Sequence, residues 1–146
     1  MEDELIEKLL EYPRLVVDFL PRRVEKNKGG QFFAVERYYL KKHCRSVSIR
    51  GKFAEIIIKL NCYFDIIVIA GENGPKLINP DPEALARLIK DNKSYILILI
   101  EAECAAVAIG TGDTHMTVYG GGKDLDDILI PLAESEGLFV WEAGAG

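Results

Sequence analysis

Residues 94–112 contain two short apolar runs separated by a tight polar turn, and this stretch constrains the fold more than any other. Its sequence is SYILILIEAECAAVAIGTG, with the turn near Glu101–Glu103. Each run has the length of a strand rather than that of a helix. Two strands joined by so short a turn pair antiparallel. We therefore expect an α+β fold, with a largely antiparallel sheet and helices packed on it.

Segments with helical periodicity alternate with further strand-like runs. A helix is expected over 79–92, where Asp81 is a typical N-cap and Pro82 suits the first helical position. The apolar spacing predicts other helices over 2–12, 48–60 and 124–137. The composition and alternation of the remaining runs predict strands at 14–20, 31–40, 64–71, 115–120 and 138–143. The strand at 64–71 is expected to be buried on both faces, because its apolar run is nearly continuous.

The two halves of the chain resemble each other. Residues 53–69 align with residues 125–141 at a constant offset of 72, and helix face, connector and strand coincide. This pattern favours one domain over 1–146, built from two α-β-β-α-β halves over 2–71 and 80–142 that are related by a pseudo-two-fold axis. The alternative is that two α+β stretches share their periodicity by chance.

Composition points to a globular protein of the cytoplasm. Of the 146 residues, 49% are hydrophobic, which is enough for one core, and no run approaches the length of a membrane-spanning helix. The start of the chain is acidic, unlike a signal peptide. The three cysteines form no CxxC pair, so neither a disulfide framework nor a metal site is expected. Cys62 and Cys104 are interpreted as small core residues.

The charge is distributed unevenly. Residues 13–52 hold eleven Lys/Arg and three acids, a balance of 11 − 3 = +8. Residues 101–142 hold one Lys and nine acids, a balance of 1 − 9 = −8. Such asymmetry indicates a charged partner, unless folding interleaves the two regions.

The stretch GTGDTHMTVYGGGKD at 110–124 is the strongest candidate for chemistry, and it fails the tests for known motifs. It matches neither the P-loop nor the dinucleotide-binding pattern, and Asp124, Asp126 and Asp127 would repel a phosphate at the following helix. Asp113 and His115 share a face of the expected strand and resemble a base with its orienting acid. No nucleophile motif accompanies them. We expect no cofactor, no metal and no catalytic set, unless these two residues line a pocket.

The acidic helix suggests a protein-binding function. Carboxylates on one helix can neutralise a basic partner, as an immunity-type or inhibitor-type protein does, and they speed association. We therefore expect a non-enzymatic module, monomer or homodimer, that binds another protein. The expected contact residues are Asp124, Asp126, Asp127, Glu134 and Glu136.

The alternative function is binding of RNA or single-stranded DNA through the basic segment 22–52. Basic side chains contact phosphates, and interleaved aromatic side chains stack on bases. The candidate contacts are Arg22, Arg23, Lys26, Lys28, Arg37, Lys41, Lys42 and Arg45.

Overall fold

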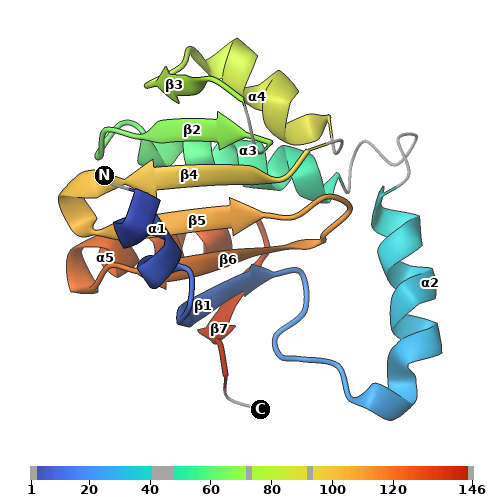
Figure 1. The fold of residues 1–146 in the computed structure, drawn as a ribbon. Helices are drawn as coiled ribbons and strands as arrows, with labels where there is room; N and C mark the ends of the chain where they lie inside the picture. Colours follow the sequence, from blue (N-terminus) through green and yellow to red (C-terminus); the bar gives the residue numbers. More distant parts are fainter. Residues whose placement is uncertain (1–2, 41–47, 72–73, 92–93, 145–146) are drawn as a thin grey trace.

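The computed structural model describes residues 3–40, 48–71, 74–91 and 94–144. Within them lies a seven-stranded sheet of order β3-β2-β4-β5-β6-β1-β7, in which every pair of neighbours is antiparallel (Figure 1). The expected α+β class with an antiparallel sheet is confirmed. The strands are β1 (Pro13–Asp18), β2 (Ile67–Ala70), β3 (Lys76–Ile78), β4 (Ile96–Ile100), β5 (Ala105–Ile109), β6 (His115–Gly120) and β7 (Phe139–Glu142).

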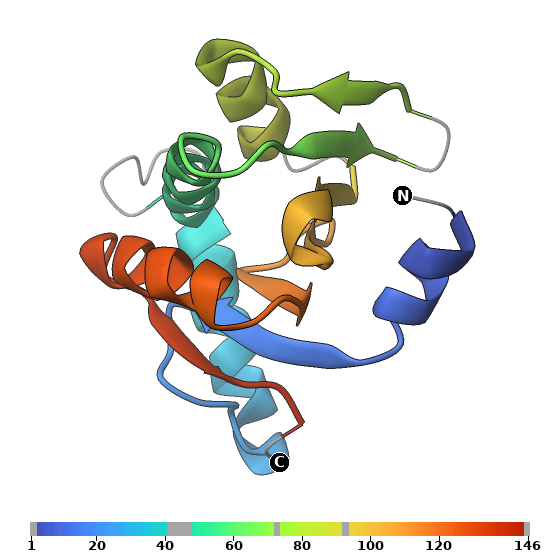
Figure 2. The same cartoon turned by 90° about the vertical axis from the view of Figure 1, so that its left-hand side faces the viewer.

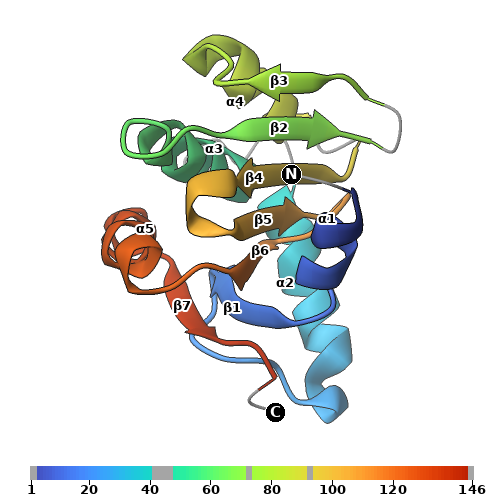
Figure 3. The same ribbon diagram turned by 60° about the vertical axis from the view of Figure 1, so that its left-hand side comes forward.

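Helices cover the two faces of the sheet unequally. One face packs against three helices and carries the main core, whereas the other is covered over β4 and β5 by α1 (Figures 2 and 3). The three helices of the main core are α3 (Ile49–Leu60), α4 (Pro82–Lys90) and α5 (Lys123–Ser135). The remaining helices in the described part of the chain are α1 (Asp3–Leu9), α2 (Gly29–Leu40) and the short 3₁₀ turns η1 (Lys26–Lys28) and η3 (Glu101–Glu103).

The predicted hairpin forms the centre of the sheet. β4 pairs with β5 from Ile96↔Ile109 to Ile100↔Ala105, and the turn between them is η3. All residues of both strands are buried, because alternate side chains point to α3–α5 on one face and to α1 on the other. The uninterrupted apolar runs therefore reflect burial on both faces.

The start of α4 also agrees with its prediction. The Asp81 carboxylate accepts a hydrogen bond from the backbone N–H of Ala84 at 3.1 Å, and Pro82 occupies the first turn. Helices α1 and α3 and strands β2, β6 and β7 lie within the expected segments, whereas α5 and β1 each begin one residue earlier than expected.

One predicted element is wrong. Residues 31–40 were expected to form a strand and instead belong to α2. The segment is rich in aromatic residues, which favour strands, but Phe32, Glu36 and Tyr39 recur at helical spacing and are the side chains that turn toward the body. The first half of the chain thus runs α1-β1-α2-α3-β2, without the second strand. The internal repeat stays a prediction.

Two smaller expectations also fail, and one strand was not expected at all. Only Val68 of β2 is fully buried, whereas Ile67 and Ile69 are partly buried against the smaller apolar cluster, so burial on the second face of this strand is incomplete. Strand β3 was not predicted, because its three exposed residues carry no alternation. Cys62 and Cys104 are exposed rather than in the core, whereas Cys44 lies outside the described residues.

None of the helices in the described ranges combines the length and apolar character that a membrane crossing requires.

Candidate functional site

Three of the basic residues of segment 13–52 form hydrogen bonds within the folded protein. The Arg14 guanidinium donates to both carboxylate oxygens of Asp126 at 2.8 and 2.7 Å and to the Gly120 carbonyl at 2.6 Å. Buried Arg50 donates to the carbonyls of Ile89 and Gly110, at 2.8 and 3.1 Å. Lys52 donates to the carbonyl of Glu136 at 2.6 Å. Folding therefore interleaves part of the basic and acidic regions.

The other basic residues of the segment gather around η1 and α2. Arg22, Arg23, Lys28 and Arg37 are exposed, and Lys26 belongs to η1. Lys41, Lys42 and Arg45 lie outside the described residues. In Figure 1, α2 stands at one side of the molecule and α5 at the other, so these two helices are separated in space.

Helix α2 is held to the body by a narrow inward stripe. The buried Thr114 hydroxyl, in the turn before β6, donates to Glu36 Oε2 at 2.9 Å. The rings of Phe19 and Tyr39 lie 5.1 Å apart. The rest of the helix circumference exposes apolar side chains at separate positions, with Phe33 at 59%, Tyr38 at 52% and Val35 at 42%. Phe33 and Tyr38 contact the inward-facing rings of Phe32 and Tyr39 edge-on, with centroids 5.7 and 5.2 Å apart, and their remaining exposed surface is available for a partner.

A pocket of about 430 Å³ lies between the start of α2 and the sheet. Its floor consists of paired residues on adjacent strands: Asp18 lies opposite His115, and Val16 lies opposite both Thr117 and Trp141. Its wall comes from the segment between β1 and α2 and from the first turn of α2. The wall residues are Arg23, Val24 and Phe32.

Asp18 is the unusual ionisable group of this pocket. It is 9% exposed, and Oδ1 accepts the backbone N–H of Phe19 at 2.7 Å. Burial raises the pKa of Asp18 above its ordinary value, against the lowering effects of that hydrogen bond and of the His115 charge. A carboxylate kept inside a pocket at the end of an apolar strand is typical of binding sites.

His115 lines the pocket, but its proposed partner does not. The nearest atoms of the pair, His115 Nε2 and Asp113 Oδ2, are 3.9 Å apart, too far for a hydrogen bond, and both side chains are partly exposed. The arrangement does not hold the imidazole in one orientation. Among the described residues, no group of three His, Cys, Asp or Glu side chains is close enough to share a metal ion.

The acidic residues predicted on α5 are divided between the fold and the surface. Asp126 is paired with Arg14, Asp127 Oδ2 with Lys123 Nζ at 2.7 Å, and Glu136 Oε2 with Lys59 Nζ at 3.8 Å. Asp124 and Glu134 are exposed. The acidic surface that remains is therefore smaller than the sequence indicates.

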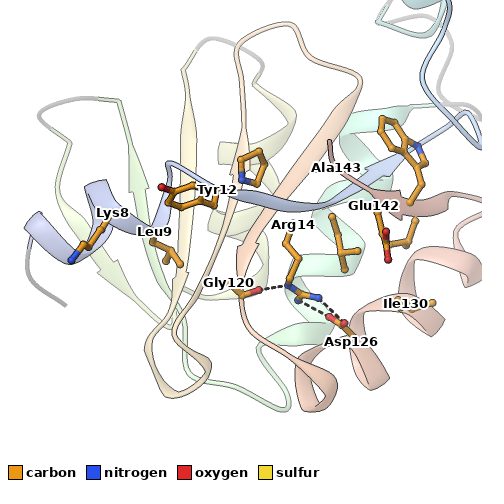
Figure 4. A pocket seen from close by; sticks show the side chains of 13 residues that line it. Lys8, Leu9, Tyr12, Arg14, Gly120, Asp126, Ile130, Glu142 and Ala143 are labelled. Atoms are coloured by element: carbon orange, nitrogen blue, oxygen red, sulfur yellow. Dashed lines mark hydrogen bonds and ion pairs between the residues drawn. The ribbon is translucent and has the colours of Figure 1, made fainter. Parts of the chain in front are cut away.

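A larger hollow of about 860 Å³ lies between α1, β1 and β7 (Figure 4). The Arg14 side chain crosses it and is engaged by Gly120 and Asp126, as the dashed lines show. Because its guanidinium already donates three hydrogen bonds, this hollow is a weaker candidate than the pocket at Asp18.

Sequence reasoning missed Asp18, Phe32 and Trp141 as site residues. The signal for Asp18 was present, since it is a lone acid ending the apolar run LVVD. Phe32 and Trp141 carry no such signal, because only the folded chain brings residues 18, 32 and 141 together.

Comparison with protein-family models, curated proteins and solved structures gives no match.

Proposed function

We propose that this protein binds single-stranded nucleic acid through the surface formed by Arg22, Arg23, Lys28 and the outer side of α2, called here the α2 surface. One observation carries the proposal: exposed basic and exposed aromatic side chains lie together on α2 and on the segment that precedes it. Among the side chains of α2 that the structure describes, Phe32, Glu36 and Tyr39 are partly buried against the body, whereas Phe33, Arg37 and Tyr38 are exposed.

The chemistry of the α2 surface matches that of a single strand. Arginine and lysine side chains neutralise phosphates and release counterions. Phenylalanine and tyrosine rings stack on unpaired bases, at roughly 1–3 kcal/mol per base. A duplex hides the faces of its bases, so these rings favour a single strand. The net charge of −5 opposes nucleic-acid binding by the molecule as a whole, so contact has to be made where basic side chains gather.

The test is the affinity for a fluorescent oligothymidylate, measured by anisotropy at several salt concentrations. With roughly four phosphate contacts, affinity should fall by about tenfold to hundredfold between 50 and 200 mM salt. R22E/R23E should bind at least about tenfold more weakly than wild type at the lower salt concentration. The matched control is K76E/R87E, which makes the same charge change at exposed positions on β3 and α4.

Two results would overturn the proposal. One is absence of binding by the wild-type protein at low salt. The other is an equal loss of oligothymidylate affinity in both double variants, which would show that the loss comes from the net charge of the protein and not from the α2 surface.

A second candidate is the protein-binding function of an immunity-type or inhibitor-type protein with a basic partner. It is favoured by the acidic end of the molecule, where the start of α5, which carries Asp124, follows a segment that is hydrogen-bonded to the end of η3 (Figure 3). A hydrogen bond of 3.3 Å between Gly121 N–H and the Cys104 carbonyl holds these segments together, and η3 contributes Glu101 and Glu103.

The test for this candidate uses Asp124 and Glu134, because changing Asp126 would also break its pair with Arg14. Pull-downs from native lysate should recover a basic protein with wild type and with the control E7K/E83K, but not with D124K/E134K. Recovery that is equal for all three proteins would contradict it.

A further inference from the structure

We propose that the pocket between α2 and the sheet holds the guanine base of a nucleotide, with Asp18 accepting the N–H groups of the base and Arg23 contacting its phosphate. For a base within a strand, this inference rests on the proposed function. The same chemistry is offered by a free guanine nucleotide, and the experiment below separates the two sources.

The pocket has the size and lining of a site for a small flat molecule. Its volume of about 430 Å³ lies within the range of small-molecule sites. Aromatic side chains reach it from three separate elements: Phe32 from α2, Tyr119 from β6 and Trp141 from β7. The Trp141 indole N–H donates to the Leu20 carbonyl at 3.2 Å, which fixes the ring in place. Such surfaces bind a heteroaromatic ring by stacking and burial.

The carboxylate of Asp18 selects among bases. An ionised carboxylate offers two oxygens and about four lone-pair sites, of which the backbone N–H groups of Phe19 and Leu20 use two. Guanine presents two neighbouring donors on one edge, the ring N1–H and the exocyclic amino group. Adenine and cytosine present a single amino group, and uracil a single ring N–H. A carboxylate in a pocket therefore favours guanine, because only that edge meets both oxygens with donors.

Burial of Asp18 supports a binding role. Taking a carboxylate out of water is unfavourable unless hydrogen-bond donors replace the water. The two donors of guanine would supply the hydrogen bonds that the folded protein alone supplies only in part. His115, which lies opposite Asp18 in the sheet, and Thr117 provide further polar contacts on the same floor.

Arg23 connects the pocket with the α2 surface. It lines the pocket and is exposed, and its neighbour Arg22 is exposed as well. A nucleotide with its base on Asp18 would thus direct its phosphate toward these two guanidinium groups. A strand could then continue along α2, past Phe33 and Tyr38.

The first part of the experiment uses the fluorescence of Trp141, the single tryptophan of the chain. Wild-type protein is titrated with the monophosphates of guanosine, adenosine, cytidine and uridine. Guanosine monophosphate should give a saturable change in emission at a concentration at least about fivefold lower than the other three require.

The second part uses oligothymidylate with and without a single central guanosine, again by anisotropy. The guanosine should raise affinity at least about fivefold in wild type. D18N replaces one acceptor oxygen by a donor and should abolish this preference, so that the variant binds the two oligonucleotides with equal affinity. The control D113N removes the same charge from a residue outside the pocket and should keep the preference.

The outcomes separate the two proposals. Tight binding of oligothymidylate without any preference for guanosine overturns the base pocket and leaves the proposed function standing. Binding of guanosine monophosphate that depends on Asp18, with no affinity for either oligonucleotide, supports the pocket as a free-nucleotide site and overturns the proposed function. Loss of the preference in D113N as well as in D18N would overturn the assigned role of Asp18.

Discussion

Helices α2 and α3 have the same length and opposite relations to the rest of the molecule. Each has 12 residues. Helix α3 buries seven residues against the sheet and the neighbouring helices, including Phe53 and Ile57, and its Ser48 cap accepts the N–H of Gly51 at 3.1 Å. Helix α2 has only partly buried side chains on its inward stripe and exposes Phe33 and Tyr38. Apolar residues in α3 stabilise the fold, whereas those on the outer side of α2 are available for binding.

The largest difference should appear when one phenylalanine of each helix is removed. Phe53→Ala deletes a fully buried ring and should lower the free energy of unfolding by about 3–5 kcal/mol. Phe33→Ala removes a ring that is 59% exposed and should change it by less than about 0.5 kcal/mol. Urea denaturation followed by circular dichroism measures both. Similar losses in the two variants would show that α2 belongs to the cooperative core.

A smaller effect is expected from the contact that attaches α2. Thr114→Val removes the hydroxyl that donates to Glu36 and leaves the carboxylate without this donor, at a cost of about 1–2 kcal/mol. The loss should be local, so backbone amides of α2 should exchange with solvent faster while those of α3 keep their protection. Hydrogen exchange followed by mass spectrometry resolves the two helices. The control is Thr111→Val, at an exposed position, and equal exchange in both variants would contradict the attachment.

The smallest effect concerns the pH dependence of stability at Asp18. The groups facing its carboxylate are His115 from β6 and, more weakly, Glu36 from α2. Because the pKa of Asp18 is raised in the folded state, the folded protein binds this proton more tightly than the unfolded chain does. The contribution of Asp18 to the free energy of unfolding is therefore present below its unfolded pKa of about 3.9. It is lost as the pH rises through the pKa of Asp18 in the folded state.

Asp18→Asn removes this dependence. Relative to wild type, its free energy of unfolding should increase as pH rises from about 4 toward neutrality. Denaturation in urea across this range measures the difference. A relative stability of the variant that falls with rising pH would mean that the carboxylate is stabilised by folding, contrary to its burial.

Much of the fold was predictable because local periodicity reflects burial. The two apolar runs around Glu101–Glu103 predict the central hairpin, and Asp81 with Pro82 predicts the start of α4. The error at 31–40 has the same origin. Apolar and aromatic residues surround α2 on nearly all sides, so the pattern that separates a helix from a strand is missing.

The candidate site was less predictable, since it depends on contacts between distant parts of the chain. The sequence indicated a basic segment with interleaved aromatics and singled out His115. It could not indicate that Arg14, Arg50 and Lys52 are used by the fold, or that Asp126 and Glu136 meet basic partners.

By itself, the sequence determined the class of fold, the central hairpin, most helices and the unequal distribution of charge, because each depends on residues close together in the chain. The tertiary structure alone decided which side of α2 faces water, which charges remain unpaired by the fold, and that Asp18, Phe32 and Trp141 share a pocket. The physical reason is that burial and ion pairing depend on neighbours in space. Here such neighbours can be 112 residues apart in the sequence, as in the Arg14–Asp126 pair.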